Sequence, residues 1–190
     1  MHILTKEEFI ANREEYFQKI LDGAVFIYPT DTIYGIGCNA LIPKAVERIR
    51  KLKQREDQPF SVIIPSIDWI YDHCKVLPDS EEYINKLPGP YTLLFKLTDQ
   101  KALAKEINPT MKGVGVRMPN HWFTKVAAFL NIPIVTTSAN VSGDNYMTTI
   151  EDLDDRIKNH VDFIIYEGEK HGKPSKIINL IDEGAKVIRD

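Results

Sequence analysis

Short apolar runs recur along this chain, and they restrict its possible folds more than any other feature of the sequence. The run AVFIY at 24–28 is wholly apolar, and FSVII at 60–64 contains a single serine. Runs without polar alternation are typical of strands buried on both faces, which need helices on either side of the sheet. Helical patterns separate the runs, and several connections are too short for a helical crossover. We therefore predict a layered α/β domain with a mixed sheet.

The pattern predicts eight strands and six helices. The expected strands are 24–28, 60–64, 92–97, 114–118, 132–137, 163–166, 176–181 and 186–189. Five expected helices are 43–54, 67–74, 81–87, 121–130 and 150–158, with Ser66, Ser80, Asn120 and Thr149 as N-caps of the last four. The sixth begins at Thr5, which forms a capping-box pattern with Glu8, and ends at Gly23. The polar segment 168–175 is the expected mobile loop.

Length and composition indicate a soluble globular protein. The 190 residues predict one domain over residues 1–190, and 43% hydrophobic against 27% charged residues is ordinary for such a domain. The net charge of −3 gives no protein-wide basic field, so a polyanion would have to bind a local patch. No apolar run approaches 18 residues and the first residues lack a signal-peptide core. We expect a cytoplasmic protein that does not bind membranes.

Cysteine and histidine spacing predicts no metal site. Cys38 and Cys74 are far apart, and the five histidines form no HxH or HxxxH group. Cys38 has no adjacent base in sequence and is interpreted as a core residue. The fragments GIG at 35–37 and GVG at 113–115 do not complete a dinucleotide fingerprint, and no Walker A sequence is present. Any nucleotide would therefore be held by dispersed cations and hydroxyl groups.

One expected helix ends in a dense group of basic residues. In RIRKLKQR at 48–55 they are Arg48, Arg50, Lys51, Lys53 and Arg55. One interpretation is a solvated helix face, and another is that cations near the C-terminus complement the helix dipole. A third is phosphate binding, because Lys53 and Arg55 lie where the helix stops before a buried strand. The pattern alone leaves the three open.

Small hydroxyl residues gather after two of the apolar strands. YPTDT at 28–32 follows one, and VTTSANVSG at 135–143 continues another. Ligands in α/β proteins bind beyond the carboxyl ends of strands, so these hydroxyls are candidates to line one pocket. The candidates are Thr30, Thr32, Thr136, Thr137, Ser138 and Asn140. The alternative for each is a helix cap or a turn.

Two arginines lie within or at the end of expected strands. Arg117 belongs to the apolar segment GVGVRMP at 113–119, and Arg189 stands one residue from the end of the sequence. An arginine inside a strand must either be paired or face a cavity, because an unpaired buried charge is costly. Both alternatives remain open for Arg117.

Five motifs taken together resemble the Sua5/YrdC/YciO family. They are YPTDTIYGIGCNA (28–40), KQR (53–55), PGPYTLLF (88–95), GVRMPNH (115–121) and TTSANVSG (136–143). They occur in the family's order, and PSKIINL (174–180) and VIR (187–189) match more weakly. The resemblance implies a twisted sheet of mixed parallel and antiparallel strands, flanked by helices and with a concave basic surface.

The resemblance also implies an activity. Family enzymes are L-threonylcarbamoyladenylate synthases, a kind of nucleotidyltransferase, which form threonylcarbamoyl-AMP and pyrophosphate from L-threonine, bicarbonate and ATP with Mg²⁺. A downstream threonylcarbamoyl transferase complex then modifies adenosine 37 of tRNA to t6A. The chain is similar to the short YrdC type. ATP, L-threonine, bicarbonate and that complex are the implied partners.

Residue roles follow from the same resemblance. Lys53 and Arg55 would be catalytic and face the ATP phosphates. The implied ATP-binding residues are Lys53, Arg55, Gln58, Ser138, Asn140, Tyr146 and Arg189. The implied threonine-binding residues are Thr32, Arg117, Thr136 and Ser175, with Arg117 binding the carboxylate. No residue is expected to bind a metal directly.

The sequence departs from the family pattern at a few positions, which motivates an alternative function. The run after KQR, EDQPF at 56–60, is one residue short, and no histidine follows the strand FSVII. With the basic run at 48–55, these departures suggest a YciO-type paralogue that binds RNA, tRNA included, or a nucleotide with little synthase activity. Phosphate contacts would make such binding strongly salt-dependent.

Overall fold

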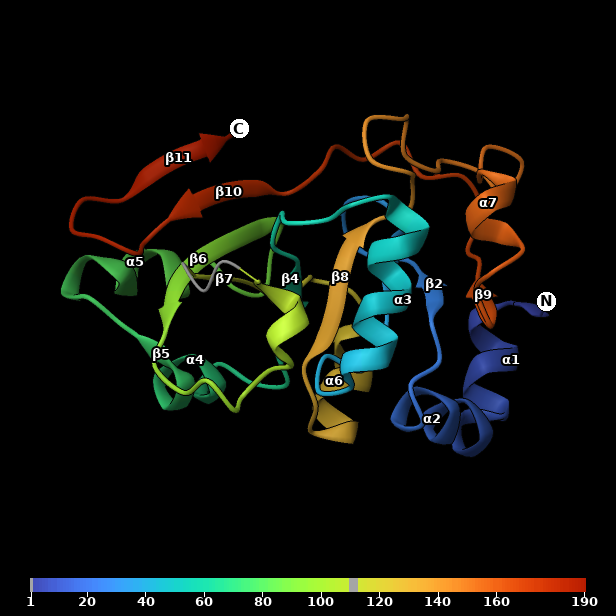
Figure 1. The fold of residues 1–190 in the computed structure, drawn as a ribbon, viewed down its shortest axis with the longest axis horizontal. Coiled ribbons are helices and arrows are strands. Elements are labelled where there is room, and N and C mark those ends of the chain that lie inside the picture. Colours follow the sequence, from blue (N-terminus) through green and yellow to red (C-terminus); the bar gives the residue numbers. More distant parts are fainter. Residues whose placement is uncertain (1, 110–112) are drawn as a thin grey trace.

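The computed structural model describes residues 2–109 and 113–190, and its framework is one twisted sheet (Figure 1). The strands are β1 (His2–Leu4), β2 (Phe26–Tyr28), β3 (Gly35–Gly37), β4 (Ser61–Ile63), β5 (Cys74–Lys75), β6 (Tyr91–Leu97), β7 (Val114–Arg117), β8 (Ile134–Ser138), β9 (Phe163–Ile165), β10 (Lys176–Asn179) and β11 (Lys186–Arg189). The helices are α1 (Lys6–Ala11), α2 (Arg13–Leu21), α3 (Pro43–Lys53), α4 (Asp68–His73), α5 (Glu81–Ile84), α6 (Thr124–Leu130) and α7 (Asp155–Lys158). Short 3₁₀ helices occupy Pro78–Ser80 and Lys105–Ile107.

The sheet is mixed, as predicted. The strand order is β1-β9-β2-β3-β8-β4-β7-β6-β10-β11. The short strand β5 pairs with the C-terminal end of β6. The pairs β1/β9, β2/β9, β4/β7 and β6/β10 are parallel, and the other pairs are antiparallel. The sheet flanked by helices confirms the predicted fold class.

Both faces of the central strands are buried, which explains their continuous apolar sequences. In β2, Ile27 packs into the core cluster that includes α3, whereas Phe26 and Tyr28 pack into the cluster that includes α1, α2 and α6. All three side chains are inaccessible to solvent. Adjacent residues of a strand point to opposite faces, so a strand covered on both sides requires an apolar residue at every position.

The N-terminal segment contains two helices where the sequence predicts one. Thr5 caps α1 through the predicted capping box with Glu8. The chain then bends at Asn12, whose backbone is not helical and whose side chain donates to the carbonyl of Glu8. The bend allows Phe9 on α1 and Tyr16 on α2 to pack against the same ring, Phe163. Tertiary packing of aromatic rings therefore overrides the continuous helical pattern.

Other predicted boundaries are wrong in ways that have local causes. Asn120 and Thr149 do not cap helices, because α6 begins four residues after Asn120 and α7 is capped by Asp154. Ile67 takes the N-cap position predicted for Ser66, and the side chain of Ser80, although at the N-cap of α5, makes no capping bond. The sequence does not predict β1, β3 and β5, because each is short and none lies in an apolar run of the kind that contains β2 and β4.

No helix in the described part of the chain is long and apolar enough to span a membrane.

The capping box provides a test of this local structure. Thr5→Ala removes the acceptor for the backbone N–H of Glu8 and should lower the free energy of unfolding by about 1 kcal/mol. Thr5→Ser keeps the hydroxyl and should be close to the parent protein in the same urea titration. Equal stability of the alanine and serine variants would contradict the role of the box.

Candidate functional site

A polar cavity lies where seven strands and four loops meet. Its volume is about 190 Å³, and β3, β4, β6, β7, β8, β10 and β11 each contribute to its wall. The predicted site residues on the wall are Arg55, Arg117, Thr136, Ser138, Tyr146, Ser175 and Arg189. Thr30 and Thr137 from the hydroxyl clusters also line it. Segments far apart in the sequence therefore converge on one site.

The cavity is suited to an anion. Its described lining includes the guanidinium groups of Arg55, Arg117 and Arg189 and no aspartate or glutamate. Burial lowers the pKa of each guanidinium, yet arginine stays charged in proteins. Arg117 is ion-paired with Asp31, which does not line the cavity, so the wall itself keeps an excess of positive charge that favours phosphates or carboxylates.

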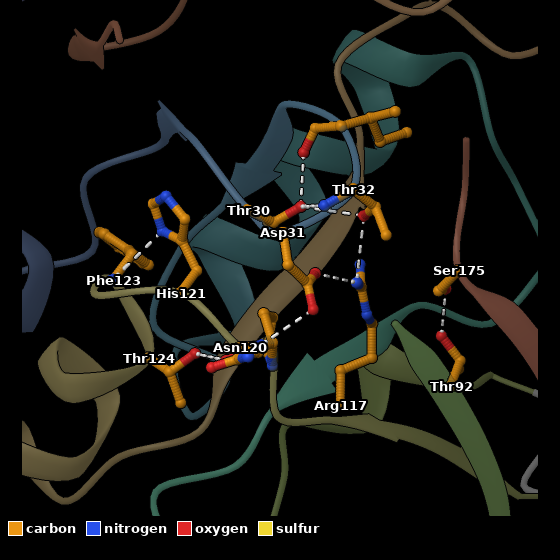
Figure 2. A network of polar contacts seen from close by, with 12 residues as sticks. Thr30, Asp31, Thr32, Thr92, Arg117, Asn120, His121, Phe123, Thr124 and Ser175 are labelled. Atoms are coloured by element: carbon orange, nitrogen blue, oxygen red, sulfur yellow. Dashed lines mark hydrogen bonds and ion pairs between the residues drawn. The ribbon is translucent and has the colours of Figure 1, made fainter. Parts of the chain in front are cut away.

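Arg117 is ion-paired and also lines the cavity. Both interpretations offered by the sequence, a paired arginine and an arginine that faces a cavity, are therefore correct. Only 7% of the residue is exposed. Its Nη2 donates to Oδ1 of Asp31 at 3.3 Å and to Oγ1 of Thr32 at 3.2 Å (Figure 2). Its Nε is buried without a partner in the described structure. The protein thus fixes Nη2 of the guanidinium, while the residue as a whole lines the cavity.

Asp31 is a site residue that sequence reasoning missed. Its Oδ1 accepts from Arg117, and its Oδ2 accepts from the backbone N–H of Asn120 at 2.9 Å. The carboxylate thus ties the turn after β2 to the turn after β7. The feature of the sequence that could have indicated Asp31 is its position inside the YPTDT motif, between two of the candidate threonines. Thr32 does not line the cavity, and its hydroxyl accepts a hydrogen bond from Arg117; its contact with a ligand stays a prediction.

A second polar group lies beside Arg117, on strand β6, which pairs with β7, and immediately before β10 (Figure 2). The hydroxyls of Thr92 and Ser175 are 2.7 Å apart and buried. Arg189 donates to the carbonyl of Ser175 through Nε at 2.9 Å and Nη2 at 2.6 Å. Sequence reasoning missed Thr92, because the parallel pairing of β6 with β10 brings it to Ser175.

Lys53 is the last residue of α3 and is buried, so the interpretation as a solvated helix face is wrong for it. It is 2% exposed, and its Nζ donates to the carbonyls of Ser138 at 2.6 Å and Asn140 at 2.7 Å. Oδ1 of Asn140 is a third acceptor at 3.2 Å. Burial, reinforced by the charge of Arg55, lowers the pKa of Lys53 to about 7. The Lys53 side chain binds backbone carbonyls at the end of β8 and does not line the cavity.

Two further predicted nucleotide residues also lie off the wall. Gln58 is exposed, and only its backbone carbonyl has a bond within the described structure, from Arg50. Asn140 faces Lys53 and Ser138, and its Nδ2 donates to the carbonyl of Asp144 at 2.7 Å. Asn140 therefore shapes the turn that presents Ser138.

The basic run at 48–55 mostly turns inward. Arg48 forms a two-bond ion pair with Asp162, and Arg50 donates to backbone carbonyls. Arg55 contacts the carbonyl of Pro59 at 2.7 Å and faces the cavity. Lys51 is exposed. The interpretation as a solvated face is correct for Lys51 and wrong for Arg50, Lys53 and Arg55.

The segment 167–175 lies against the cavity's wall. The Tyr34 hydroxyl accepts from the backbone N–H of Glu167 at 2.9 Å and donates to the carbonyl of Gly168 at 2.7 Å. Burial raises the pKa of Tyr34 to about 12, so the hydroxyl keeps the proton that it donates. Gly172 is so close to the carbonyl of Thr32 that a Cβ would lie 1.8 Å from it. The expected mobility of this loop stays a prediction.

The fold and the cavity define an α/β protein with a polar cavity lined by three arginines at the strand ends. A model of the Sua5/YciO/YrdC family, described as telomere recombination, matches residues 18–190. A putative threonylcarbamoyl-AMP synthase of Methanocaldococcus jannaschii is 33% identical over 192 residues, which cover 98% of this chain and 89% of that protein. The chain belongs to the Sua5/YciO/YrdC family, which confirms the resemblance seen in the motifs.

Solved structures agree with the family assignment. Pyrococcus abyssi Sua5 complexed with L-threonine superposes with a TM-score of 0.86 at 28% identity, covering 99% of this chain and 56% of that one. The YciO structure of Escherichia coli superposes with a TM-score of 0.85 at 24% identity, covering 100% and 94%, which shows the shared fold. The chain spans about half the length of the mammalian threonylcarbamoyl-AMP synthases that it matches.

The buried position of Lys53 leads to a stability prediction. Lys53→Met leaves the carbonyls of Ser138 and Asn140 unpaired and should lower the free energy of unfolding by about 2 kcal/mol. Lys51→Met, on the exposed side of the same helix, should change it by less than about 0.5 kcal/mol. Urea denaturation measures both. If the two variants are equally stable, the inward contacts of Lys53 contribute nothing.

Proposed function

We propose that this chain is an L-threonylcarbamoyladenylate synthase, a nucleotidyltransferase that forms threonylcarbamoyl-AMP and pyrophosphate. The observation that carries the proposal is the convergence of Arg55, Arg117 and Arg189 on one cavity free of described carboxylates. The reaction brings together a carboxylate and a triphosphate, and such a cavity suits both. Relatives named as threonylcarbamoyl-AMP synthases, and a Sua5 complexed with L-threonine, support the same activity.

The reaction proceeds in two balanced steps. The amino group of threonine and bicarbonate give a carbamate with loss of water. A carbamate oxygen then bonds to the α-phosphorus of ATP, the bond from that phosphorus to the bridging oxygen breaks, and pyrophosphate leaves. Positioning and charge stabilisation supply most of the rate of such a transfer, with little covalent assistance from the protein.

The cavity divides into an amino-acid side and a nucleotide side. On the first, Arg117 binds the threonine carboxylate, with Thr136 and Ser175 beside it. On the second, Arg55 and Arg189 face the phosphates. Ser138 and Tyr146 complete the nucleotide side. Three residues outside the lining hold wall residues in place. Ser138 is held by Lys53 and Asn140, and Arg117 is held by Thr32.

Mg²⁺ fits this site as an ion carried by the nucleotide. The described lining offers hydroxyl groups and guanidinium groups but no carboxylate, and no group of three histidine, cysteine or acidic side chains able to hold a metal occurs in residues 2–109 and 113–190. Mg²⁺ commonly binds substrate phosphates and keeps several waters. When bound it neutralises the charge of the leaving pyrophosphate.

The product determines what must follow. Threonylcarbamoyl-AMP is a mixed anhydride, so it serves as an acyl donor, and the proposed acceptor is adenosine 37 of tRNA, modified to t6A by a downstream transferase complex. Soluble substrates and tRNA modification agree with a cytoplasmic protein.

The RNA-binding alternative receives less support from the structure. The basic run that motivated it has Arg48 paired with Asp162 and Arg50 and Lys53 bonded to backbone carbonyls. These groups have few free donors for a phosphate backbone. An uncharacterised YciO of Escherichia coli, 28% identical over 172 residues, keeps the alternative as the second candidate.

Matched lysine variants of Arg117 and Arg55 test separately whether the two sides of the cavity bind threonine and ATP. Arg117→Lys keeps the charge but loses the planar fork, so the Kd for L-threonine should rise at least about tenfold. Arg55→Lys should raise the Kd for ATP by a similar factor and leave threonine binding unchanged. Calorimetric titration of each ligand measures both, alongside pyrophosphate release with threonine, bicarbonate, ATP and Mg²⁺. If the parent protein releases no pyrophosphate and forms no threonylcarbamoyl-AMP, the proposed function is wrong.

The contact between Gly172 and Thr32 leads to a second test. Gly172→Ala places a Cβ within 1.8 Å of the carbonyl of Thr32 and must push the segment away from the amino-acid side. We expect a Kd for L-threonine raised about tenfold with ATP binding within twofold. Gly184→Ala strains the backbone at a φ of +80° but adds a Cβ with nothing within 4 Å, so it controls for lost stability and should leave both constants unchanged. Unchanged threonine binding in Gly172→Ala would show that the segment does not contribute to that side.

A further inference from the structure

Arg50 has an unusual set of partners on the last turns of α3. Its Nε donates to the carbonyl of Glu106 at 2.7 Å, and its Nη2 donates to that of Ile107 at 3.2 Å. Its Nη1 is within 3.2 Å of three more carbonyls, those of Arg55, Glu56 and Gln58. One guanidinium therefore serves two separate backbone segments, the 3₁₀ helix at Lys105–Ile107 and the turn at 55–58.

The turn at 55–58 contains no regular secondary structure. Three carbonyls in it converge on Nη1 of Arg50, and the N–H of Arg55 in turn donates to the carbonyl of Arg50 at 3.0 Å. Backbone carbonyls that turn inward need a donor, and without Arg50 these would have to turn toward solvent. The conformation of the turn therefore depends on this side chain.

The same arginine is linked to Arg55 through an aromatic ring. The guanidinium carbons of Arg50 and Arg55 lie 4.6 Å and 5.1 Å from the centroid of Phe60, which is 1% exposed. Arg55 also donates to the carbonyl of Pro59 at 2.7 Å. The backbone of Arg55 and the ring on which it stacks are thus both contacts of Arg50.

We propose that Arg50 is a positioning residue for the nucleotide side of the cavity. It does not line the cavity; it fixes the turn at 55–58 and the ring of Phe60 so that Arg55 points at the phosphates. This inference rests on the proposed function for the identity of the ligand. The amino-acid side is independent of Arg50, since Arg117 is held by Asp31 and Thr32.

Lysine cannot replace this arginine. Arg50 uses a flat fork of five N–H donors, in which Nε, Nη1 and Nη2 point in fixed directions. An ammonium group has three donors on one atom and cannot reach carbonyls on two segments at once. Restoring the charge alone should therefore not restore the position of Arg55.

The test compares Arg50→Lys and Arg50→Met with Arg48→Met, which removes an arginine two residues earlier that is paired with Asp162 away from the cavity. Calorimetry measures the Kd of ATP and of L-threonine separately. We expect both Arg50 variants to weaken ATP binding at least about tenfold and to leave threonine binding within twofold. Arg48→Met should leave both within twofold.

Amide hydrogen exchange over residues 54–60 gives a readout that needs no ligand. Exchange there should be at least about tenfold faster in the Arg50 variants than in Arg48→Met. If Arg50→Met does not fold, Arg50→Lys and Phe60→Leu provide the same two measurements. An ATP Kd and an exchange rate equal to those of Arg48→Met, or full rescue by lysine, would overturn the inference. If the parent protein binds neither ligand, the proposed function fails, and the exchange comparison still decides whether Arg50 fixes the turn.

Discussion

Cations that are taken out of water and bonded to backbone oxygens hold the site of this protein together. Desolvating a charge costs several kcal/mol, so each buried cation requires oxygen atoms arranged around it. Lys53 meets this requirement with carbonyls at the end of β8, and Arg117 meets it with Asp31 and Thr32. Arg50 meets it with five carbonyls from two segments. The same bonds that compensate the charges fix the turns between strands, and these turns form the cavity.

This arrangement separates the cations into two kinds. Lys53 and Arg50 have their donors occupied by the protein and do not line the cavity. Arg55 and Arg117 line it and each keep a buried Nε without a described partner. The guanidinium groups of these two residues are therefore cations that a ligand in the cavity would meet. The site is therefore organised before any ligand binds, which would lower the cost of positioning the two charged substrates of the proposed reaction.

The sequence predicts most of the helices and strands correctly but predicts many of their boundaries wrongly. Continuous apolar runs correctly indicated β2 and β4, because a strand buried on both faces must be apolar throughout. The strand β3, which contains two glycines, carries no such signal and exists because β2 and β8 pair with it on either side. The bend at Asn12 likewise follows from the packing of Phe9 and Tyr16 on one ring. Predicted helix caps were wrong where the helix begins later than its pattern indicates, as α7 does after its N-cap Asp154.

By itself the sequence determined the class of fold, the family and the residue types at the site, since these depend on local patterns and on motifs in a conserved order along one chain. Only the tertiary structure decided which members of those motifs reach the cavity. Lys53 and Arg55 are two residues apart, yet the left-handed residue Gln54 between them ends the helix, sending one side chain into the core and the other to the cavity. Thr92 and Ser175 are 83 positions apart and meet through strand pairing. Direction and distance in space depend on chain reversals and pairings between remote segments, and no local pattern contains them.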